Sequence, residues 1–334
     1  MRRAVVLAVL AQAGVARADS SVEVTLNAQG EQLAADLGFS VADMIATTKV
    51  KIDELYKVSR LDQLLRGFAD TAASAQRGLG VDYDPDSGDI LIGATAGAIQ
   101  GDVAIGTTNE YAGSIFNFAV MAGVNLGRWN QPRWTVFANG FYESTTIHDL
   151  DGTLLTLGAH VQYRLVPPTA PSRVRWIGVL ATTGLEYAGW TLGKATGGTI
   201  ESHFTATGTN GSKTIHMSST GTLEVDATIL TVPVELTTGV RFLDVFTFYG
   251  GGGVDLTTGE STVVAQLNST LSINADQLPV GTAIITGSDA NSPSGVSVHG
   301  LVGFEIHTRH VRVALQGAFA PGETAVNLGL RIAL

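Results

Sequence analysis

The chain ends in Asn327-Leu328-Gly329-Leu330-Arg331-Ile332-Ala333-Leu334, where apolar side chains recur at every second position up to the last residue. Successive residues of a β-strand point to opposite faces, so the leucines and the isoleucine share one face and Asn327, Gly329 and Arg331 share the other. An unbroken apolar face opposite a polar, glycine-containing face is typical of a strand between lipid and a polar interior. The stretch therefore predicts a membrane β-strand that ends with the chain.

Four positions of this strand carry a resemblance to a known family. Asn327, Gly329 two residues later, and apolar Ile332 and Leu334 at the third-last and last positions resemble the C-terminal signal of bacterial outer-membrane β-barrels. The match covers eight residues, and Leu334 stands where phenylalanine is more usual. The resemblance implies a Gram-negative outer-membrane barrel whose partners are outer-membrane lipid and the barrel-assembly machinery.

The N-terminus has the pattern of a secretory signal peptide over residues 1–18. Arg2 and Arg3 supply the positive start, a short apolar run follows, and Ala16-Arg17-Ala18 forms a small-x-small cleavage site. The apolar run is too short to span a bilayer as a helical anchor, which is the alternative interpretation. We expect the mature chain to begin near Asp19 and to leave the cytoplasm.

Composition excludes several classes of protein. Although 45% of the 334 residues are hydrophobic, no later segment has the roughly 18 uninterrupted apolar residues of a transmembrane helix. The absence of cysteine excludes a disulfide scaffold and thiol chemistry. The net charge of −10 argues against nucleic acid as a partner. Forty glycines against nine prolines favour strands and turns.

Residues 19–78 differ in character from the rest of the chain. Between residues 31 and 77 apolar positions recur at steps of three and four, the period of an amphipathic helix. Ser40 followed by Asp43, and Ser59 followed by Asp62, have the pattern of helix N-caps. We predict two or three helices that plug the barrel, cap its periplasmic mouth or dock on another protein. Two helices would not fit inside ten strands, so a lumenal plug would imply a larger barrel.

From residue 79 to 334 the period becomes two, and turns separate segments of the length of membrane strands. The predicted fold class is an all-β transmembrane barrel of about ten antiparallel strands with a short N-terminal helical region. The ten strands are expected at 88–105, 116–126, 134–142, 155–165, 177–187, 230–242, 246–256, 296–306, 311–319 and 326–334.

The connections between these strands indicate two different barrel ends. Those at 130–132, 167–172, 243–244 and 309–310 are short, as periplasmic turns are, and all nine arginines after residue 78 lie near that end. Asn210-Gly211 is a strong hairpin signal, so residues 199–223 should extend beyond the membrane as a ribbon, and residues 261–286 should do the same. If either extracellular ribbon joined the wall, the barrel would have twelve strands or more.

Polar side chains on the inward faces are the candidate site. We expect them to form a structural network of paired charges inside the barrel rather than a catalytic, metal or cofactor site. Enzymatic activity is not expected, because Asp149 and Asp151 are the only close acidic pair at a loop and the histidines lie within strands or, like His310, at the opposite end of the barrel. The predicted lumen-facing residues are Glu143, His160, Arg164, Glu186, Glu235, Arg241, Asp255, His299, Glu305 and His307.

Two functions remain open. The first is a narrow, porin-like channel or uptake barrel for small solutes, gated by the N-terminal helices. The second is a non-conducting structural or adhesive barrel that displays its extracellular hairpins. A soluble, secreted β-sandwich is disfavoured because the outward rows of Phe and Val would aggregate in water.

Overall fold

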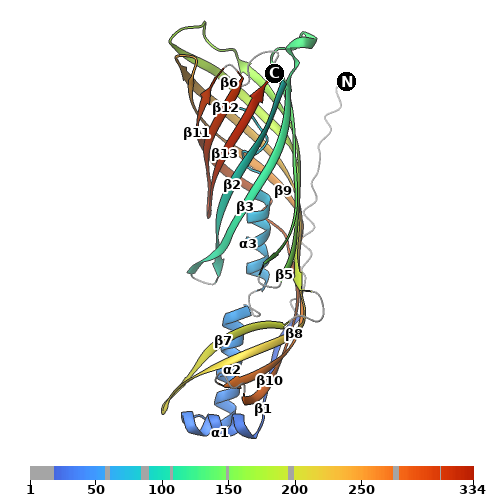
Figure 1. The fold of residues 1–334 in the computed structure, drawn as a ribbon, viewed down its shortest axis with the longest axis vertical. Coiled ribbons are helices and arrows are strands. Elements are labelled where there is room, and N and C mark those ends of the chain that lie inside the picture. The colour runs from blue at the N-terminus through green and yellow to red at the C-terminus, as the bar shows by residue number, and fades with distance from the viewer. Residues whose placement is uncertain are drawn as a thin grey trace, which may run out of the picture.

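The computed structural model describes residues 19–56, 61–83, 90–105, 108–147, 150–194, 199–273, 278–308 and 310–334. The predicted signal peptide, residues 1–18, lies outside the described residues. Figure 1 shows a tall barrel, a helix inside it and a smaller sheet with two helices at one end.

Ten antiparallel strands close the barrel, and the ring runs β9-β11-β12-β13-β2-β3-β4-β5-β6-β8 before returning to β9. The C-terminal strand pairs with the first wall strand, so residues 327–334 help to close the ring. The prediction of a ten-stranded antiparallel barrel is confirmed. The wall strands are β2 (Ile90–Ile105), β3 (Thr108–Asn125), β4 (Trp134–Ile147), β5 (Leu150–Val166), β6 (Val174–Lys194), β8 (Gly211–Phe242), β9 (Phe246–Ile273), β11 (Val296–His307), β12 (Val311–Ala320) and β13 (Glu323–Ala333).

The outer surface of the ring is apolar. On β13, Leu328, Leu330 and Ile332 are exposed, whereas Asn327 and Arg331, on the opposite face of the strand, are buried inside the barrel. Exposed aromatic side chains gather toward both ends of this apolar surface, as in the girdles of membrane barrels. They are Trp129, Trp134, Trp176, Phe242 and Phe246 toward one end and Phe116, Tyr142 and Phe319 toward the other. The fold is therefore that of an outer-membrane-type β-barrel, as the C-terminal resemblance predicted.

The structure describes no helix with the length and apolar character needed to cross a membrane.

A charge placed on the apolar surface should destabilise the protein in lipid. Val302 lies on the outer face of β11 and is 56% exposed. We expect Val302→Arg to lower the free energy of unfolding by about 2–4 kcal/mol in phospholipid vesicles, measured by denaturant titration. Thr270→Arg, on an exposed position of β9 beyond the barrel wall, should change it by no more than about 0.5 kcal/mol. Equal effects of the two substitutions would contradict a lipid-facing surface.

The two ends of the barrel differ. At the turn end lie the connections between β3 and β4, β5 and β6, β8 and β9, and β11 and β12, together with Ile90 and Leu334, whose backbones hydrogen-bond to each other. At the opposite end, β8 and β9 continue past the ring into a second sheet with the order β1-β10-β9-β8-β7. We call this sheet and the two helices on it the distal module, and this end of the barrel the module end.

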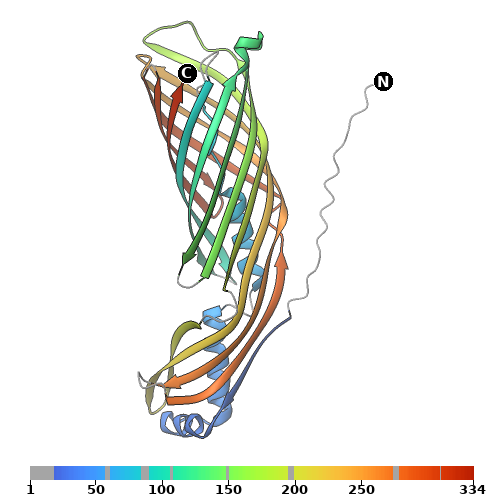
Figure 2. The same ribbon diagram turned by 45° about the vertical axis from the view of Figure 1, so that its right-hand side comes forward.

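The distal module joins distant parts of the sequence. Its remaining strands are β1 (Asp19–Leu26), β7 (Thr199–Gly208) and β10 (Leu278–Asn291). β7 and β8 form the hairpin that Asn210-Gly211 predicted, with Thr207 paired to Ser212. Neither ribbon enters the ring, so the wall keeps ten strands. Figure 2 shows β8 and β9 curving out of the barrel into the module, where β10 pairs with β9.

Two helices cover one face of the module sheet. Helix α1 (Ala28–Leu37) begins where the side chain of Asn27 accepts a hydrogen bond from the backbone of Gly30, and α2 (Val41–Tyr56) begins at Ser40, whose hydroxyl accepts from the backbone of Asp43. Their apolar faces and the sheet share one core. The buried residues of this core are Val24, Leu33, Ala34, Leu37, Met44, Ile52, Phe204, Ala206, Ile215, Met217, Leu267, Leu271, Val280, Ala283 and Ile285.

Three expectations need correction. Residues 19–26 form a strand rather than part of a helical region, because Val22, Val24 and Leu26 alternate and pair with β10. Helices α1 and α2 lie at the module end, not at the turn end that sequence analysis took as periplasmic. The connections do not alternate in length throughout, since only two residues separate β2 from β3 and β4 from β5 at the module end.

Candidate functional site

Among the described residues, one helix lies inside the barrel. Helix α3 (Leu61–Ser74) enters from the module end and contacts the wall strands β2, β3, β6, β8 and β9 and the module strand β10 (Figure 1). Ala69 and Ala72 pack against Ala188, Ala227 and Ile229 of the wall. Because four of these five side chains are alanines, the helix lies close to the strands. The expectation that a lumenal plug implies more than ten strands was therefore wrong. Of the described helices only α3 enters the lumen, and it faces the wall with the small side chains of Ala69 and Ala72.

The chain continues through the lumen after α3. Every residue from 74 to 83 is buried, although residues 75–83 form neither helix nor strand. We call α3 and residues 75–83 the plug. Side chains of the wall satisfy the backbone carbonyls of this irregular segment, as buried polar groups require. Asn117 donates to the Ala75 carbonyl, Asn327 to Arg77, Arg331 to Val81 and Gln162 to Asp82.

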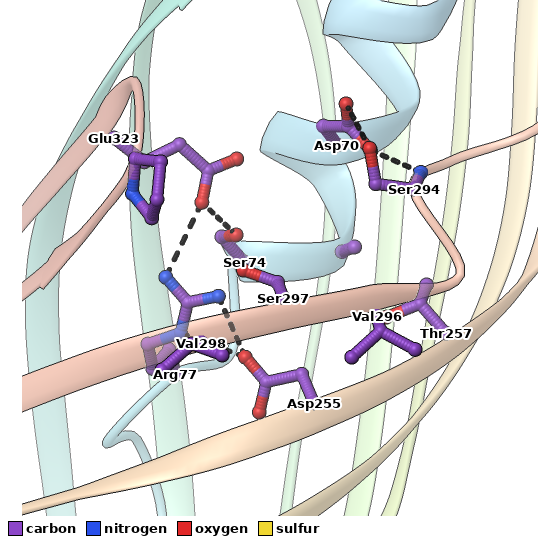
Figure 3. A pocket seen from close by; sticks show the side chains of 12 residues that line it. Asp70, Ser74, Arg77, Asp255, Thr257, Ser294, Val296, Ser297, Val298 and Glu323 are labelled. Carbon is purple, nitrogen blue, oxygen red and sulfur yellow. Dashed lines mark hydrogen bonds and ion pairs between the residues drawn. The ribbon is translucent and has the colours of Figure 1, made fainter.

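Contacts of Asp70, Ser74 and Arg77 fix the part of the plug nearest the module to the module end of the barrel (Figure 3). Asp70 accepts hydrogen bonds from the backbone and the hydroxyl of Ser294, at 2.5 and 3.1 Å. Arg77 lies between Asp255, at 2.6 Å, and Glu323, at 3.2 Å. Ser74 also donates to Glu323.

A cavity of about 310 Å³ lies beside these contacts, between α3 and the wall. Figure 3 shows its lining, which combines carboxylates, hydroxyls and one guanidinium with two valines. The lining residues are Asp70, Ala73, Ser74, Arg77, Asp255, Thr257, Ser294, Val296, Ser297, Val298, Pro321 and Glu323.

A second group of charges holds the far end of the plug. Asp82 is fully buried and lies 2.6 Å from Arg312 and 3.9 Å from Arg331. Arg331 also contacts Glu305 at 3.1 Å, and Glu305 contacts His307 at 2.8 Å. Since opposite charges alternate through the group, each buried charge lies beside a partner that lowers the energetic cost of its burial.

An aromatic contact lies between the two charged groups. The ring of Tyr83 stacks on that of Tyr249 with centroids 5.2 Å apart, and its hydroxyl donates to Glu235 at 3.0 Å. Glu235 and Asp255 contact the two ring nitrogens of His299, at 3.0 and 3.1 Å. The plug is thus connected to β8, β9 and β11 through one continuous polar network.

The structure distributes the ten predicted lumen-facing residues among several environments. Glu235, Asp255 and His299 meet in the network around Tyr83, and Arg241 and His307 lie within 3.4 Å of each other beside Glu305. His160 lies 3.7 Å from Glu186 and 3.2 Å from Asn139. Arg164 is only partly buried. Glu143 shares the inward face of β4 but is exposed near the module end.

The plug residues of this network, Arg77, Asp82 and Tyr83, are not among the predicted site residues. Asp82 and Tyr83 resemble a solvated turn before the first wall strand, and Arg77 and Glu323 follow no local pattern. The local sequence around Asp82 and Tyr83 gives no sign that these side chains are buried. Their partners, Arg312 and Glu235, lie on strands more than 150 residues away in the sequence. Within the described ranges, no three His, Asp or Glu side chains are arranged to hold a metal ion.

The backbone of the plug depends on glycine at two tight positions. Gly78 has a φ of +72° and Gly80 a φ of +76°, and a Cβ would overlap the side chain of Gln316 at the first and that of Asn139 at the second. We expect Gly80→Ala to destabilise the docked plug by about 1–3 kcal/mol, because left-handed strain adds to the overlap. Limited proteolysis of the folded barrel would measure the loss as faster cleavage within residues 61–83. Gly295→Ala, where a Cβ meets no atom closer than 3.9 Å, is the matched control and should leave the cleavage rate unchanged.

Comparison with known proteins gives one family and several solved barrels. The model of the Lsa36-like family matches residues 11–334. No curated protein matches the chain. Among solved structures, the chain is similar to the attachment invasion locus protein Ail of Yersinia pestis, with 9% identity, a TM-score of 0.28 and coverage of 75% of this chain and 98% of that one.

Two further structures show the same distant likeness. The translocator domain of autotransporter NalP from Neisseria meningitidis has 12% identity and a TM-score of 0.33, with coverage of 78% of this chain and 91% of that one. The toluene transporter TodX of P. putida has 9% identity and a TM-score of 0.26, with coverage of 81% and 92%. The barrel itself is defined by the strand pairing described above.

Proposed function

The chain belongs to the Lsa36-like family, and we propose that it is a closed outer-membrane barrel that anchors the distal module rather than a constitutively open channel. The observation that carries the proposal is the plug. Residues 61–83 occupy the lumen, and buried ion pairs of Arg77 and Asp82 with the wall hold them at two separate levels. The proposal assigns the chain no catalytic role.

The attachment of the module supports an anchoring role. β8 and β9 pair without interruption from Phe242 and Phe246 at the turn end to Ile215 and Ile273 in the module. The module therefore has no hinge of irregular chain between these two strands and the barrel. A barrel that only conducted solutes would not need a separate apolar core at its mouth.

Single-channel recording tests this proposal directly. The mature chain, beginning at Asp19, is refolded into planar lipid bilayers at neutral pH. We expect no steady conductance, because the plug occupies the lumen and is hydrogen-bonded to the wall along its length. A stable, resolved current from the intact chain would overturn the proposal and favour a narrow channel for small solutes.

The second candidate function is a channel that opens when the plug moves. The cavity of about 310 Å³ beside α3 favours it, since water and small solutes already have space next to Asp70 and Glu323. A disulfide between Asp70→Cys and Ser294→Cys, whose side chains are in contact, would lock the plug to the wall. Solute uptake by vesicles that stops on oxidation and returns on reduction would support the gated channel. Uptake that is absent in both states supports the closed anchor.

A further inference from the structure

The chain runs through its own barrel from one end to the other. Helix α2 lies in the distal module, α3 lies inside the ring, residues 75–83 continue through the lumen, and Ile90 begins the wall beside Leu334 at the turn end (Figures 1 and 2). Residues 19–56 therefore lie at the end of the barrel opposite to the start of the first wall strand.

The excursions of the wall strands indicate which end faces outward. In bacterial barrels the turns on the periplasmic side are short and the long excursions are extracellular. Here both large excursions lie at the module end. One consists of β7 and the distal part of β8, and the other of the distal part of β9 and β10. The distal module is accordingly on the outside, and the turn end with Leu334 is on the periplasmic side.

From this topology we propose that the barrel is the route by which its own N-terminal segment, residues 19–56, crosses the outer membrane. The inference rests on the proposed outer-membrane location and on export by residues 1–18, which deliver Asp19 to the periplasm. Asp19 is the first residue of β1 and lies in the module, so the segment has to pass from one side of the ring to the other. The plug is the part of the chain that stays in the lumen after residues 19–56 have crossed.

The size of the passage agrees with one segment of chain. Helix α3 fits against the wall because Ala69 and Ala72 meet small side chains there, and the segment after it is irregular and only one chain wide. Helices α1 and α2, which pack together on the sheet, occupy a layer outside the ring. Residues 19–56 can therefore pass through the lumen only as an unfolded chain, before α1 and α2 have folded onto the sheet.

Folding outside the ring gives the crossing its direction. Six of the fifteen buried residues of the module core come from residues 19–56, and nine come from the distal parts of β7 to β10. Without the N-terminal segment, the apolar face of this sheet would be exposed to water. When residues 19–56 fold onto the module sheet, the apolar face of the segment and that of the sheet are both buried outside the membrane. This burial makes it unfavourable for the segment to move back into the lumen, so the crossing needs no external energy source.

Cysteine labelling tests the route, because the natural chain contains no cysteine. Three single variants place a thiol at exposed positions: Lys49→Cys on α2, Lys213→Cys beside the β7–β8 hairpin and Gln131→Cys at the turn end. Intact Gram-negative cells that express each variant are treated with a membrane-impermeant maleimide. Labelling is compared with that of the same cells after the outer membrane is opened.

We expect Lys49→Cys and Lys213→Cys to be labelled in intact cells and Gln131→Cys only in opened cells. Labelling of Lys213→Cys without Lys49→Cys would overturn the crossing of the N-terminal segment and leave the closed barrel in place. Labelling of Gln131→Cys alone in intact cells would overturn the orientation. A failure of the closed-barrel proposal appears in the conductance measurement instead, so the two are distinguishable.

A variant of the module core tests the origin of the direction. Ile52 on α2 is fully buried in the module, and Ile52→Asp prevents the helix from docking there. In this background we expect the surface labelling of Lys49→Cys to fall several-fold, while that of Lys213→Cys persists. Unchanged labelling of Lys49→Cys would overturn the role of module folding.

Discussion

A chain that lacks residues 19–83 will carry steady ion current in a planar bilayer, whereas the chain that begins at Asp19 will not. The deletion removes α3 and the irregular segment after it but leaves all ten wall strands intact. The exposed inner wall carries Asp255, Glu305, Arg312 and Arg331, which are charged and will be hydrated when the plug is absent. A polar, hydrated lumen conducts ions.

A shorter deletion is the matched control for this experiment. Removal of residues 19–56 takes away β1, α1 and α2 but keeps the plug, with the contact of Asp70 to Ser294 and that of Arg77 to Asp255. This chain should stay closed, although part of its module is missing. If both truncated chains are silent, the wall side chains themselves fill the lumen. If both conduct, α3 does not hold its place without the module. The first result would contradict the assignment of residues 61–83 as the plug, and the second would contradict the expectation that the contacts of Asp70 and Arg77 alone hold it.

Substitution of Asp82 by alanine should weaken plug docking by about 3–5 kcal/mol, the range for removing one partner from a buried ion pair. The Asp82 carboxylate is 0% exposed, lies 2.6 Å from Arg312 and is also near Arg331. Its loss removes the carboxylate that Arg312 contacts at 2.6 Å, whereas Arg331 keeps Glu305 at 3.1 Å. A buried charge that loses its nearest counter-ion costs more than the lost attraction alone, because the lumen solvates it poorly.

The effect should appear as transient opening. In bilayer recordings, Asp82→Ala is expected to show brief current steps that the natural chain lacks, because the undocked plug is populated more often. Asp36→Ala, an exposed position on α1, is the control and should show none. The double variant Asp82→Ala with Arg312→Leu should recover part of the closed state. A silent Asp82→Ala chain with natural proteolytic resistance would mean that Asp82 does not hold the plug.

The barrel could be predicted because the sequence signal for each wall strand lies within that strand. Each wall strand repeats the two-residue period over ten or more positions, and Asn210-Gly211 marks its hairpin by the backbone conformation that these residues favour. Strand β1 carries the same signal in Val22, Val24 and Leu26. It is short, however, and its partner β10 lies more than 250 residues away.

Of the candidate site, only the residues of the barrel wall could be predicted. Inward positions of wall strands follow from alternation, which is why His299, Asp255 and Glu235 could be named together. The plug residues have no such period, since residues 75–83 are irregular and depend on side chains of other strands for their hydrogen bonds. The entry of α3 alone could have been indicated by Ala69, Ala72 and Ala73, which let it approach the wall. No signal in the sequence pairs Asp82 with Arg312.

The uninterrupted pairing of β8 and β9 gives the module mechanical strength. A load that draws the module away from the barrel along these strands is carried by the two covalent backbones of β8 and β9. The two strands can leave the ring only if their hydrogen bonds to β6 and β11 yield together in shear. The same bonds loaded one at a time, from one end of the ladder, would break at lower force.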